Sequence, residues 1–261
     1  MSSATGPNRV ALVTGGAQGI GRAIALRLAS DGLDVAVNDI PSKLALLTTV
    51  VGEIQSLGRK GVALPYDVRE DEEVKSMVDK TVDELGRLDV MVANAGIGGG
   101  YMPIMEADPA KWEAIFAVNI RGVVLCYKYA AKQMVKQGGG GRIIGASSVG
   151  GLKGFANTGA YCITKAAVRS LTQTAALEFA DHGITVNAYA PGVIETNLTI
   201  RDTDSKLGGP TETFKRALKI THAKTGQPEF VASLVSYLAS PDSHFVTGQT
   251  ISIDGGLNSG I

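Results

Sequence analysis

The stretch RVALVTGGAQGIG, residues 9–21, decides the fold. A short apolar run at 9–14 ends in glycines at positions 15, 16, 19 and 21, and a helical pattern follows over 20–31. A run this short is typical of a buried strand, and glycines allow the tight turn that leads from a strand directly into a helix. The stretch therefore predicts a strand, a glycine-rich turn and a helix in succession.

The same alternation continues along the chain. Further apolar runs lie at 34–39, 61–67, 88–96, 142–148, 184–192 and 249–256, and helical patterns lie near 43–58, 70–86, 108–137, 159–181 and 228–239. The runs are continuously apolar and lack the alternation of apolar and polar residues that is typical of a sheet with one face exposed to solvent. We therefore expect a parallel sheet covered by helices on both faces. The predicted fold class is α/β, in three layers and doubly wound.

The domain organisation is predicted to be simple. Parallel α/β architectures often reach about 250 residues as one unit, and no linker or shift in composition divides these 261 residues, so we expect a single domain over 1–261. The GGGG at 138–141 is interpreted as an exposed turn. Residues 195–227 interrupt the alternation with a long polar stretch, which is typical of a lid or binding loop, and we predict a substrate-binding loop there.

Composition argues against several classes of protein. Charged residues make up 19% and the formal net charge is +0, which favours neither nucleic acid nor a membrane surface as a partner. No apolar stretch reaches about 18 residues, and the start MSSATGPNR lacks a secretory leader, so we expect a cytoplasmic protein. We interpret Cys126 and Cys162 as reduced thiols and, since the three histidines are scattered, predict no metal site.

The glycine-rich turn predicts a phosphate site. Gly15, Gly19 and Gly21 let the backbone approach a pyrophosphate, while the start of the next helix supplies N–H donors and a positive dipole; Gln18 and Ile20 belong to the same turn. The spacing is a variant of G-x-G-x-x-G with a longer first gap. A tight turn without a ligand is the alternative.

An acid ends the second predicted strand. Asp39 stands where a dinucleotide-binding fold places the carboxylate that binds the adenosine ribose, and it would repel a 2′-phosphate, so NAD is favoured over NADP. Arg22, in the helix after the glycine turn, keeps weak use of NADP open. The alternative is an ordinary turn or cap residue at a strand end, with Asn38 sharing that role.

The next two strands also end in polar or small residues. Asp67 and Val68 end the third strand, and Asn94 and Gly96 end the fourth. Because ligands lie across the carboxyl ends of parallel strands, these residues are candidates for contacts with adenine and its ribose. Taken singly, each is equally compatible with a turn.

A phenol and an ammonium stand four residues apart in GAYCITKAAV, residues 159–168. In a helix Tyr161 and Lys165 share one face, and a nearby cation stabilises the phenolate of a tyrosine whose ordinary pKa is about 10. The pair is therefore a candidate acid/base unit; a surface lysine beside a half-buried tyrosine is the alternative. Ser148, at the end of the fifth strand, can donate to the same substrate oxygen as Tyr161.

Asn119 is a polar residue in the apolar helix AIFAVNIRGVV. A buried amide needs hydrogen-bond partners, which would be backbone groups or a water chain that leads to Lys165. A core asparagine that bends the helix is the alternative.

Together these motifs resemble the short-chain dehydrogenase/reductase family in its single-domain form. The matching stretches are TGGAQGIG, NAG at 94–96, VNIRG around Asn119, Ser148, YCITK and PGVIET at 191–196, and the resemblance runs from about residue 9 to the closing TGQTISIDGG. It implies a Rossmann-type fold with a seven-stranded parallel sheet, a catalytic tetrad of Asn119, Ser148, Tyr161 and Lys165, and contacts to the nicotinamide part of NAD from Pro191, Gly192, Val193 and Thr196.

The resemblance also implies the chemistry. Hydride would pass between nicotinamide C4 and the carbon of a secondary alcohol or ketone, the proton would pass through Tyr161, and Lys165 would bind the nicotinamide ribose and lower the pKa of Tyr161. Asn119 would support a water that replenishes the proton. Members of the family commonly form homotetramers through their long helices and the C-terminal strand, here 108–137, 159–181 and 249–256.

Two questions stay open from the sequence. TQTAALEFADHGITVNAYAPG is most similar to diacetyl, acetoin and butanediol dehydrogenases, whereas Val149, Leu152 and Phe155 favour a more apolar cyclic alcohol. A catalytically silent nucleotide sensor or scaffold of the same fold is the alternative function. An NAD-dependent epimerase or dehydratase, which also uses tyrosine and lysine, usually needs a further C-terminal substrate domain.

Overall fold

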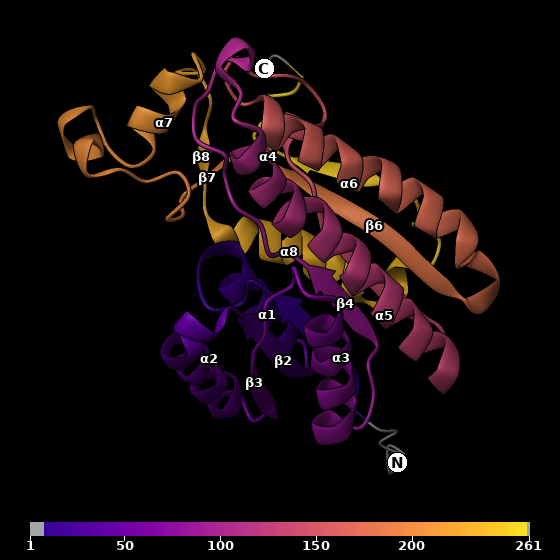
Figure 1. Ribbon diagram of the computed structural model, residues 1–261. Coiled ribbons are helices and arrows are strands. Elements are labelled where there is room, and N and C mark those ends of the chain that lie inside the picture. The colour runs from indigo at the N-terminus through magenta and orange to yellow at the C-terminus, as the bar shows by residue number, and fades with distance from the viewer. Residues whose placement is uncertain (1–7, 260–261) are drawn as a thin grey trace.

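The computed structural model describes residues 8–259, and its centre is one sheet of seven strands (Figure 1). All neighbouring strands are parallel, in the order β3-β2-β1-β4-β5-β6-β9. Their bounds are β1 Val10–Thr14, β2 Asp34–Asp39, β3 Gly61–Pro65, β4 Val90–Ala93, β5 Gly141–Ala146, β6 Ile184–Pro191 and β9 Thr250–Ile253. The predicted doubly wound, seven-stranded parallel sheet is confirmed.

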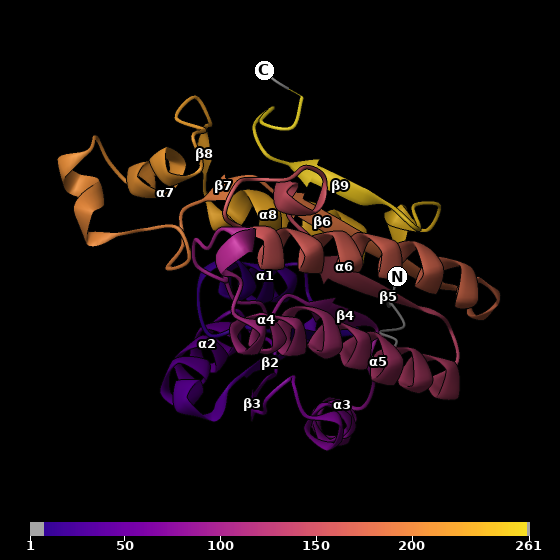
Figure 2. The ribbon, with the colours of Figure 1, turned by 45° about the horizontal axis from the view of Figure 1, so that its top comes forward.

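Helices cover both faces of this sheet (Figures 1 and 2). One face packs against α1 Gly19–Ser30, α2 Leu44–Ser56 and α8 Pro228–Ala239, and the other against α3 Asp71–Leu85, α5 Val123–Gln137 and α6 Gly159–Glu178. Successive residues of a strand serve opposite faces: Val13 packs in the first core and Leu12 in the second. Because both faces of the central strands are buried, these strands are mainly apolar, as the sequence predicts, although β2 and β6 also bury Asn38 and Asn187.

The expected helix at 108–137 is not regular throughout. It consists of α4 Pro109–Phe116, a π-helical turn Ala117–Gly122 and α5. The π-turn lies around Asn119, whose amide bonds to backbone outside the helix. Although Pro109–Gln137 is long and apolar enough to span a membrane, half of its most apolar stretch is buried inside the protein, and Cys126 and Met134 on α5 belong to the core.

The polar stretch at 195–227 carries structure of its own, which the sequence did not predict. It contains a 3-10 turn at Asp202–Lys206 and helix α7 Glu212–Ala217, and its end forms β8 Thr225–Gly226, which pairs with β7 Val193–Ile194. Figure 2 shows this segment projecting from one end of the sheet. We call residues 195–227 the flap. The remaining 3-10 turns are Pro41–Lys43, Ile104–Glu106, Val149–Gly151, Ala180–His182 and Pro241–Ser243.

Candidate active site

A cavity of about 540 Å³ runs along the carboxyl edge of the sheet. The strand order reverses between β1 and β4, and ligands of open α/β sheets bind at such a reversal. The cavity is lined by most of the residues expected to hold a dinucleotide, namely Gly15, Gln18, Gly19, Ile20, Gly21, Asp39, Asp67, Val68, Asn94, Gly96, Tyr161, Lys165, Pro191 and Thr196. Gly192 and Val193 line a neighbouring cavity.

The glycine-rich turn is shaped by close backbone contacts. A Cβ atom on Gly21 would lie 2.1 Å from the carbonyl oxygen of Gly15, and one on Gly15, whose φ is +64°, would lie 3.0 Å from Cα of Ala95. The turn delivers the chain into α1, whose N-cap residue Gln18 makes no side-chain cap hydrogen bond. The first N–H groups of α1 therefore stay available for an anion, which fits a pyrophosphate.

Asp39 holds the turn beside it. Its carboxylate accepts hydrogen bonds from the backbone N–H groups of Ile40 at 2.9 Å and Ala17 at 3.4 Å. A carboxylate has about four acceptor positions, so capacity remains for ribose hydroxyls. Arg22 lies elsewhere: it forms two hydrogen bonds with Glu53, at 2.6 and 3.0 Å, and lines a groove between α1, α2 and α8. The suggestion that Arg22 supports NADP therefore has no basis in its position.

Two further polar residues of the cavity are engaged with protein partners. Asp67 binds Arg69 at 2.5 and 2.9 Å, and this hydrogen bonding lowers the pKa of Asp67. The Asn94 amide donates to the Thr14 carbonyl at 2.8 Å, while its oxygen accepts from the Tyr189 hydroxyl at 2.8 Å. Asn94 thus ties the end of β4 to β1 and β6, in line with the structural alternative from the sequence.

The helix α6 carries Tyr161 and Lys165 to the cavity. Lys165 is 4% exposed, its ammonium donates to the carbonyl oxygen of Ala146 at 2.8 Å, and burial lowers its pKa to about 8. Burial raises the pKa of Tyr161, and the neighbouring Ser148 hydroxyl acts in the opposite direction. Desolvation of the phenol is the largest of these effects in the protein alone, where the Lys165 ammonium is directed at the carbonyl of Ala146.

Asn119 is fully buried and lines neither cavity. Its oxygen accepts from the N–H of Ile97 at 2.8 Å, and its amide donates to the Ile97 carbonyl at 2.9 Å and to the Thr164 hydroxyl at 3.2 Å. The sequence left backbone groups or a water chain as partners for Asn119, and the backbone groups are present. Asn119 therefore fixes the loop after β4 where Gly96 passes Lys165; a Cβ on Gly96 would lie 3.3 Å from the Lys165 nitrogen.

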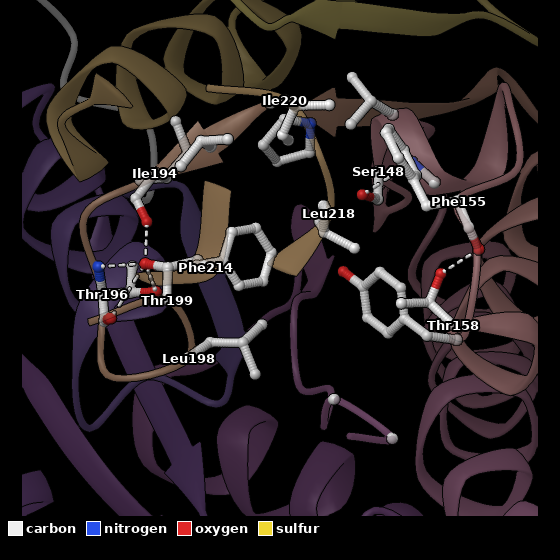
Figure 3. A pocket seen from close by; sticks show the side chains of 18 of the residues that line it. Ser148, Phe155, Thr158, Ile194, Thr196, Leu198, Thr199, Phe214, Leu218 and Ile220 are labelled. Atoms are coloured by element: carbon white, nitrogen blue, oxygen red, sulfur yellow. Dashed lines mark hydrogen bonds between the residues drawn. The ribbon is translucent and has the colours of Figure 1, made fainter. Parts of the chain in front are cut away.

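A second cavity, of about 150 Å³, adjoins the first (Figure 3). The two share Ile20, Tyr161, Pro191, Thr196 and Leu198 in their walls, so Tyr161 lies where they meet. Figure 3 shows Ser148 facing the flap residues Phe214 and Leu218. The sequence predicted the flap only as a range; its apolar residues at 214, 218 and 220, within a polar stretch, were the signal that its wall is apolar.

The threonines of this second cavity are bonded internally. Thr199 donates to the Ile194 carbonyl at 2.5 Å and Thr158 donates to the Phe155 carbonyl at 2.8 Å (Figure 3). Ser148 accepts from the N–H of Gly150 at 3.1 Å, which leaves its own proton to donate. The hydroxyls of Ser148 and Tyr161 are thus able to bind a ligand oxygen, in a wall that also contains the polar side chains of Tyr101, Thr196 and Arg201.

A buried acid organises the flap. The Asp204 carboxylate accepts from the backbone N–H groups of Arg201, Thr211 and Thr213 at 2.8, 2.9 and 2.8 Å. Burial acts to raise the pKa of Asp204, but these hydrogen bonds outweigh it and hold the pKa well below its usual range. Asn197 also donates to Gln18 at 3.2 Å, which links the flap to the glycine turn.

Among residues 8–259, no group of three or more His, Cys, Asp or Glu side chains gathers to form a metal site. Cys126 and Cys162 are free thiols.

Comparison with known proteins gives extensive matches. A family model described as enoyl-(acyl carrier protein) reductase matches residues 15–258. The short-chain dehydrogenase/reductase eriH of Hericium erinaceus is 49% identical over 95% of this chain and 96% of its own. An (S)-acetoin-forming diacetyl reductase of Staphylococcus epidermidis is 41% identical over 96% of this chain and 98% of its own.

Solved structures also match nearly the whole length of the chain. A short-chain dehydrogenase from Burkholderia cenocepacia J2315 in complex with NADP superposes with a TM-score of 0.85 at 34% identity, covering 97% of this chain and 98% of that one.

Proposed function

The chain belongs to the short-chain dehydrogenase/reductase family of oxidoreductases, and from that premise we propose that it interconverts a secondary alcohol and a ketone with a nicotinamide dinucleotide. The position of Tyr161 carries the proposal: its side chain lines both the long cavity with the glycine turn and the apolar cavity. A group that gives or takes a proton at this position would lie where a substrate in the apolar cavity meets a dinucleotide in the long cavity.

The catalytic roles follow from the surroundings of each group. Ser148 donates to the substrate oxygen, and Tyr161 gives or takes the proton of that oxygen. With a pKa of about 8, Lys165 is mainly charged at neutral pH, and its cation favours the phenolate as the proton leaves. The dinucleotide, when bound, supplies or accepts the hydride. Asn119 acts as a positioning residue through the Ile97 backbone.

NAD is the cofactor that we propose as preferred. The carboxylate of Asp39 suits ribose hydroxyls and repels a 2′-phosphate. Gly15, Gly19 and Gly21, with Gln18 and Ile20, would hold the pyrophosphate; Asp67, Val68, Asn94 and Gly96 would lie along the adenosine; and Pro191, Gly192, Val193 and Thr196 would contact the nicotinamide.

The substrate that the second cavity favours is a mainly hydrocarbon, cyclic alcohol or ketone. Phe155, Phe214, Leu218 and Ile220 supply apolar wall, and the hydroxyls of Thr158 and Thr199 already donate to protein carbonyls. A small diketone, the substrate in the name of the Staphylococcus relative, has a second oxygen, for which the wall offers Tyr101, Thr196 and Arg201, but it would leave the apolar side chains of this wall uncovered.

A cytoplasmic homotetramer completes the proposal. Large apolar side chains are exposed on α5 and α6 and before β9, among them Ile163 at 48%, Leu177 at 82% and Phe245 at 94%. Exposed apolar surface of this kind is typical of contacts between subunits. The free thiols of Cys126 and Cys162 suit a reducing compartment.

The test is a screen of nicotinamide absorbance with NADH and NADPH, in both directions, against small diketones and cyclic, aromatic, sugar and terpenoid ketones or alcohols. We expect turnover with NADH, faster with cyclic or aromatic ketones than with diacetyl, and slower by orders of magnitude in the Tyr161→Phe variant. Nucleotide binding without turnover of any class would instead support a silent sensor.

A further inference from the structure

We propose that Arg201 and Tyr101 bind a carboxylate on the substrate, so that this chain prefers keto or hydroxy acids with a hydrocarbon body over neutral ketones and alcohols. The inference rests on the proposed function and narrows its substrate class.

Arg201 differs from the rest of the second cavity in its charge. Of the described residues that line this cavity, Arg201 alone is charged, whereas most of the wall is hydrocarbon or glycine. The proton chemistry proposed above needs Ser148 and Tyr161 and gives the Arg201 guanidinium no role. A cation that borders an apolar wall favours a ligand of opposite charge, because neither charge is then left uncompensated.

The flap fixes the backbone of Arg201 and leaves its charge unpaired. The Arg201 N–H donates to the Asp204 carboxylate at 2.8 Å, and the same carboxylate accepts from the N–H groups of Thr211 and Thr213. Asp204 is thus occupied by backbone donors. Within residues 8–259 the Arg201 side chain forms no ion pair with Asp204 or with any other acid.

The Arg201 guanidinium also has donors to spare. Its Nη1 donates to the Ile200 carbonyl at 2.6 Å. A guanidinium carries N–H donors on all three nitrogens, in a fork that fits the two oxygens of a carboxylate. The Nε and Nη2 atoms of Arg201 form such an edge, and the side chain is exposed, so a ligand can reach it.

Tyr101 supplies a further donor from a different segment. It lies in the loop after β4, whereas Arg201 lies in the flap, and both line the same cavity. Burial raises the pKa of Tyr101, while the positive charge of Arg201, close enough to act on the phenol, works in the opposite direction. The phenol therefore keeps its proton at neutral pH and can donate it to a carboxylate. Such a substrate would place its ketone at Ser148 and Tyr161 and its hydrocarbon body against the apolar wall.

Two pairs of ketones test the inference: para-acetylbenzoate with para-acetylbenzamide, and 4-oxocyclohexanecarboxylate with its amide. The members of a pair have nearly the same shape and differ in charge. With NADH at low salt, we expect kcat/KM to be about two- to tenfold higher for the acid than for the amide in at least one pair, as for one partly exposed ion pair. High salt should weaken this preference, because salt screens exposed charges.

Variants of the two residues assign the preference. Arg201→Gln should remove it, Arg201→Lys should keep part of it because the charge remains, and Tyr101→Phe should reduce it. Arg216→Gln is the matched control, since Arg216 is an exposed arginine of α7 in the same flap and lines neither cavity. It removes the same charge from the flap and should keep the preference.

Calorimetric titration of the same ketones into the enzyme saturated with NAD, which cannot reduce them, gives Kd values apart from turnover. The role of Arg201 is overturned if neither acid is preferred over its amide, or if Arg201→Gln weakens acid and amide equally. Preferred binding of the acids without turnover of any ketone would support the role of Arg201 and refute the proposed function instead.

Discussion

The Lys165 ammonium lies 5.6 Å from the centroid of the Tyr161 ring. The two residues are four apart on α6, so one face of the helix presents both groups. The ammonium is also anchored to the end of β5 through Ala146. This arrangement places a buried cation beside a phenol, where its influence on a developing phenolate is larger than in solvent.

Replacing Tyr161 with phenylalanine removes only the hydroxyl. We expect turnover to fall about 100- to 10,000-fold, the usual range for the loss of a general acid or base, while the Kd of NADH changes little because the glycine turn is untouched. Steady-state kinetics and a nucleotide titration on the same sample measure both quantities. An active Tyr161→Phe enzyme would refute the assignment.

Replacing Lys165 with methionine should abolish turnover and yet stabilise the fold. Lys165 has a pKa of about 8 in the folded protein, against 10.5 ordinarily, because burial disfavours its charge. Below about pH 8 the folded state carries the full cost of burying this charge, on the order of 3 kcal/mol. The net stabilisation by Lys165→Met is smaller than this cost, because the variant also loses the hydrogen bond to Ala146. Between these two pKa values, about 8 and 10.5, the unfolded chain keeps a proton on Lys165 that the folded chain has released. The stability of the wild type therefore rises with pH in this range.

The stabilisation by Lys165→Met should therefore be largest near neutral pH and should vanish by about pH 10. Urea unfolding of wild type and variant at both pH values measures it. Lys136→Met is the control, since Lys136 is an exposed residue of α5 and its loss should give no such dependence on pH. Equal differences in free energy of unfolding at both pH values would contradict the buried, charged lysine.

The strands and the catalytic spacing could be predicted because both are local. RVALVTGGAQGIG contains its strand, turn and helix within one short stretch, and Tyr161 and Lys165 share a face through helix geometry alone. The parallel arrangement of the strands follows the same logic, since alternating strands and helices give a parallel, covered sheet.

The features that escaped prediction depend on partners distant in the chain. The π-turn at Asn119 is accompanied by bonds to Ile97 in the loop after β4, and Arg22 lies away from the cavity because Glu53 of α2 binds it. The fold of the flap depends on Asp204, which gathers the N–H groups of Thr211 and Thr213 from the next turn. Such pairings have no periodic signal in the sequence.

A single methyl group at Gly21 should abolish nucleotide binding. In Gly21→Ala the Cβ would lie 2.1 Å from the Gly15 carbonyl and 2.6 Å from the Asn94 amide, so the turn must shift, at about 1–3 kcal/mol of stability. Gly52→Ala is the matched control, because a Cβ there meets no atom within 4 Å in helix α2. It should retain binding and gain about 0.5–1 kcal/mol. Normal NADH affinity in Gly21→Ala would refute the tight turn.

Asp204→Asn should loosen the flap while leaving the nucleotide site intact. An asparagine has one acceptor oxygen, so its NH₂ group would face at least one of the N–H groups of Arg201, Thr211 and Thr213 that now donate to the carboxylate. We expect faster trypsin cleavage at Lys206 and a KM for ketones raised about tenfold, equivalent to about 1.4 kcal/mol, with the Kd of NADH nearly unchanged.

Acid should act on the wild-type flap in the same way, but only at low pH. Because the folded state holds the pKa of Asp204 below its usual value of 3.8, the carboxylate stabilises the flap fully above that value and loses this contribution as the pH falls further. Cleavage within the flap by an acid-active protease should therefore rise only below about pH 4 in the wild type, and the pH dependence should be absent in Asp204→Asn. Asp202→Asn, at an exposed neighbour, should behave as wild type. If Asp202→Asn and Asp204→Asn are cleaved at the same rate, the carboxylate of Asp204 does not hold the flap.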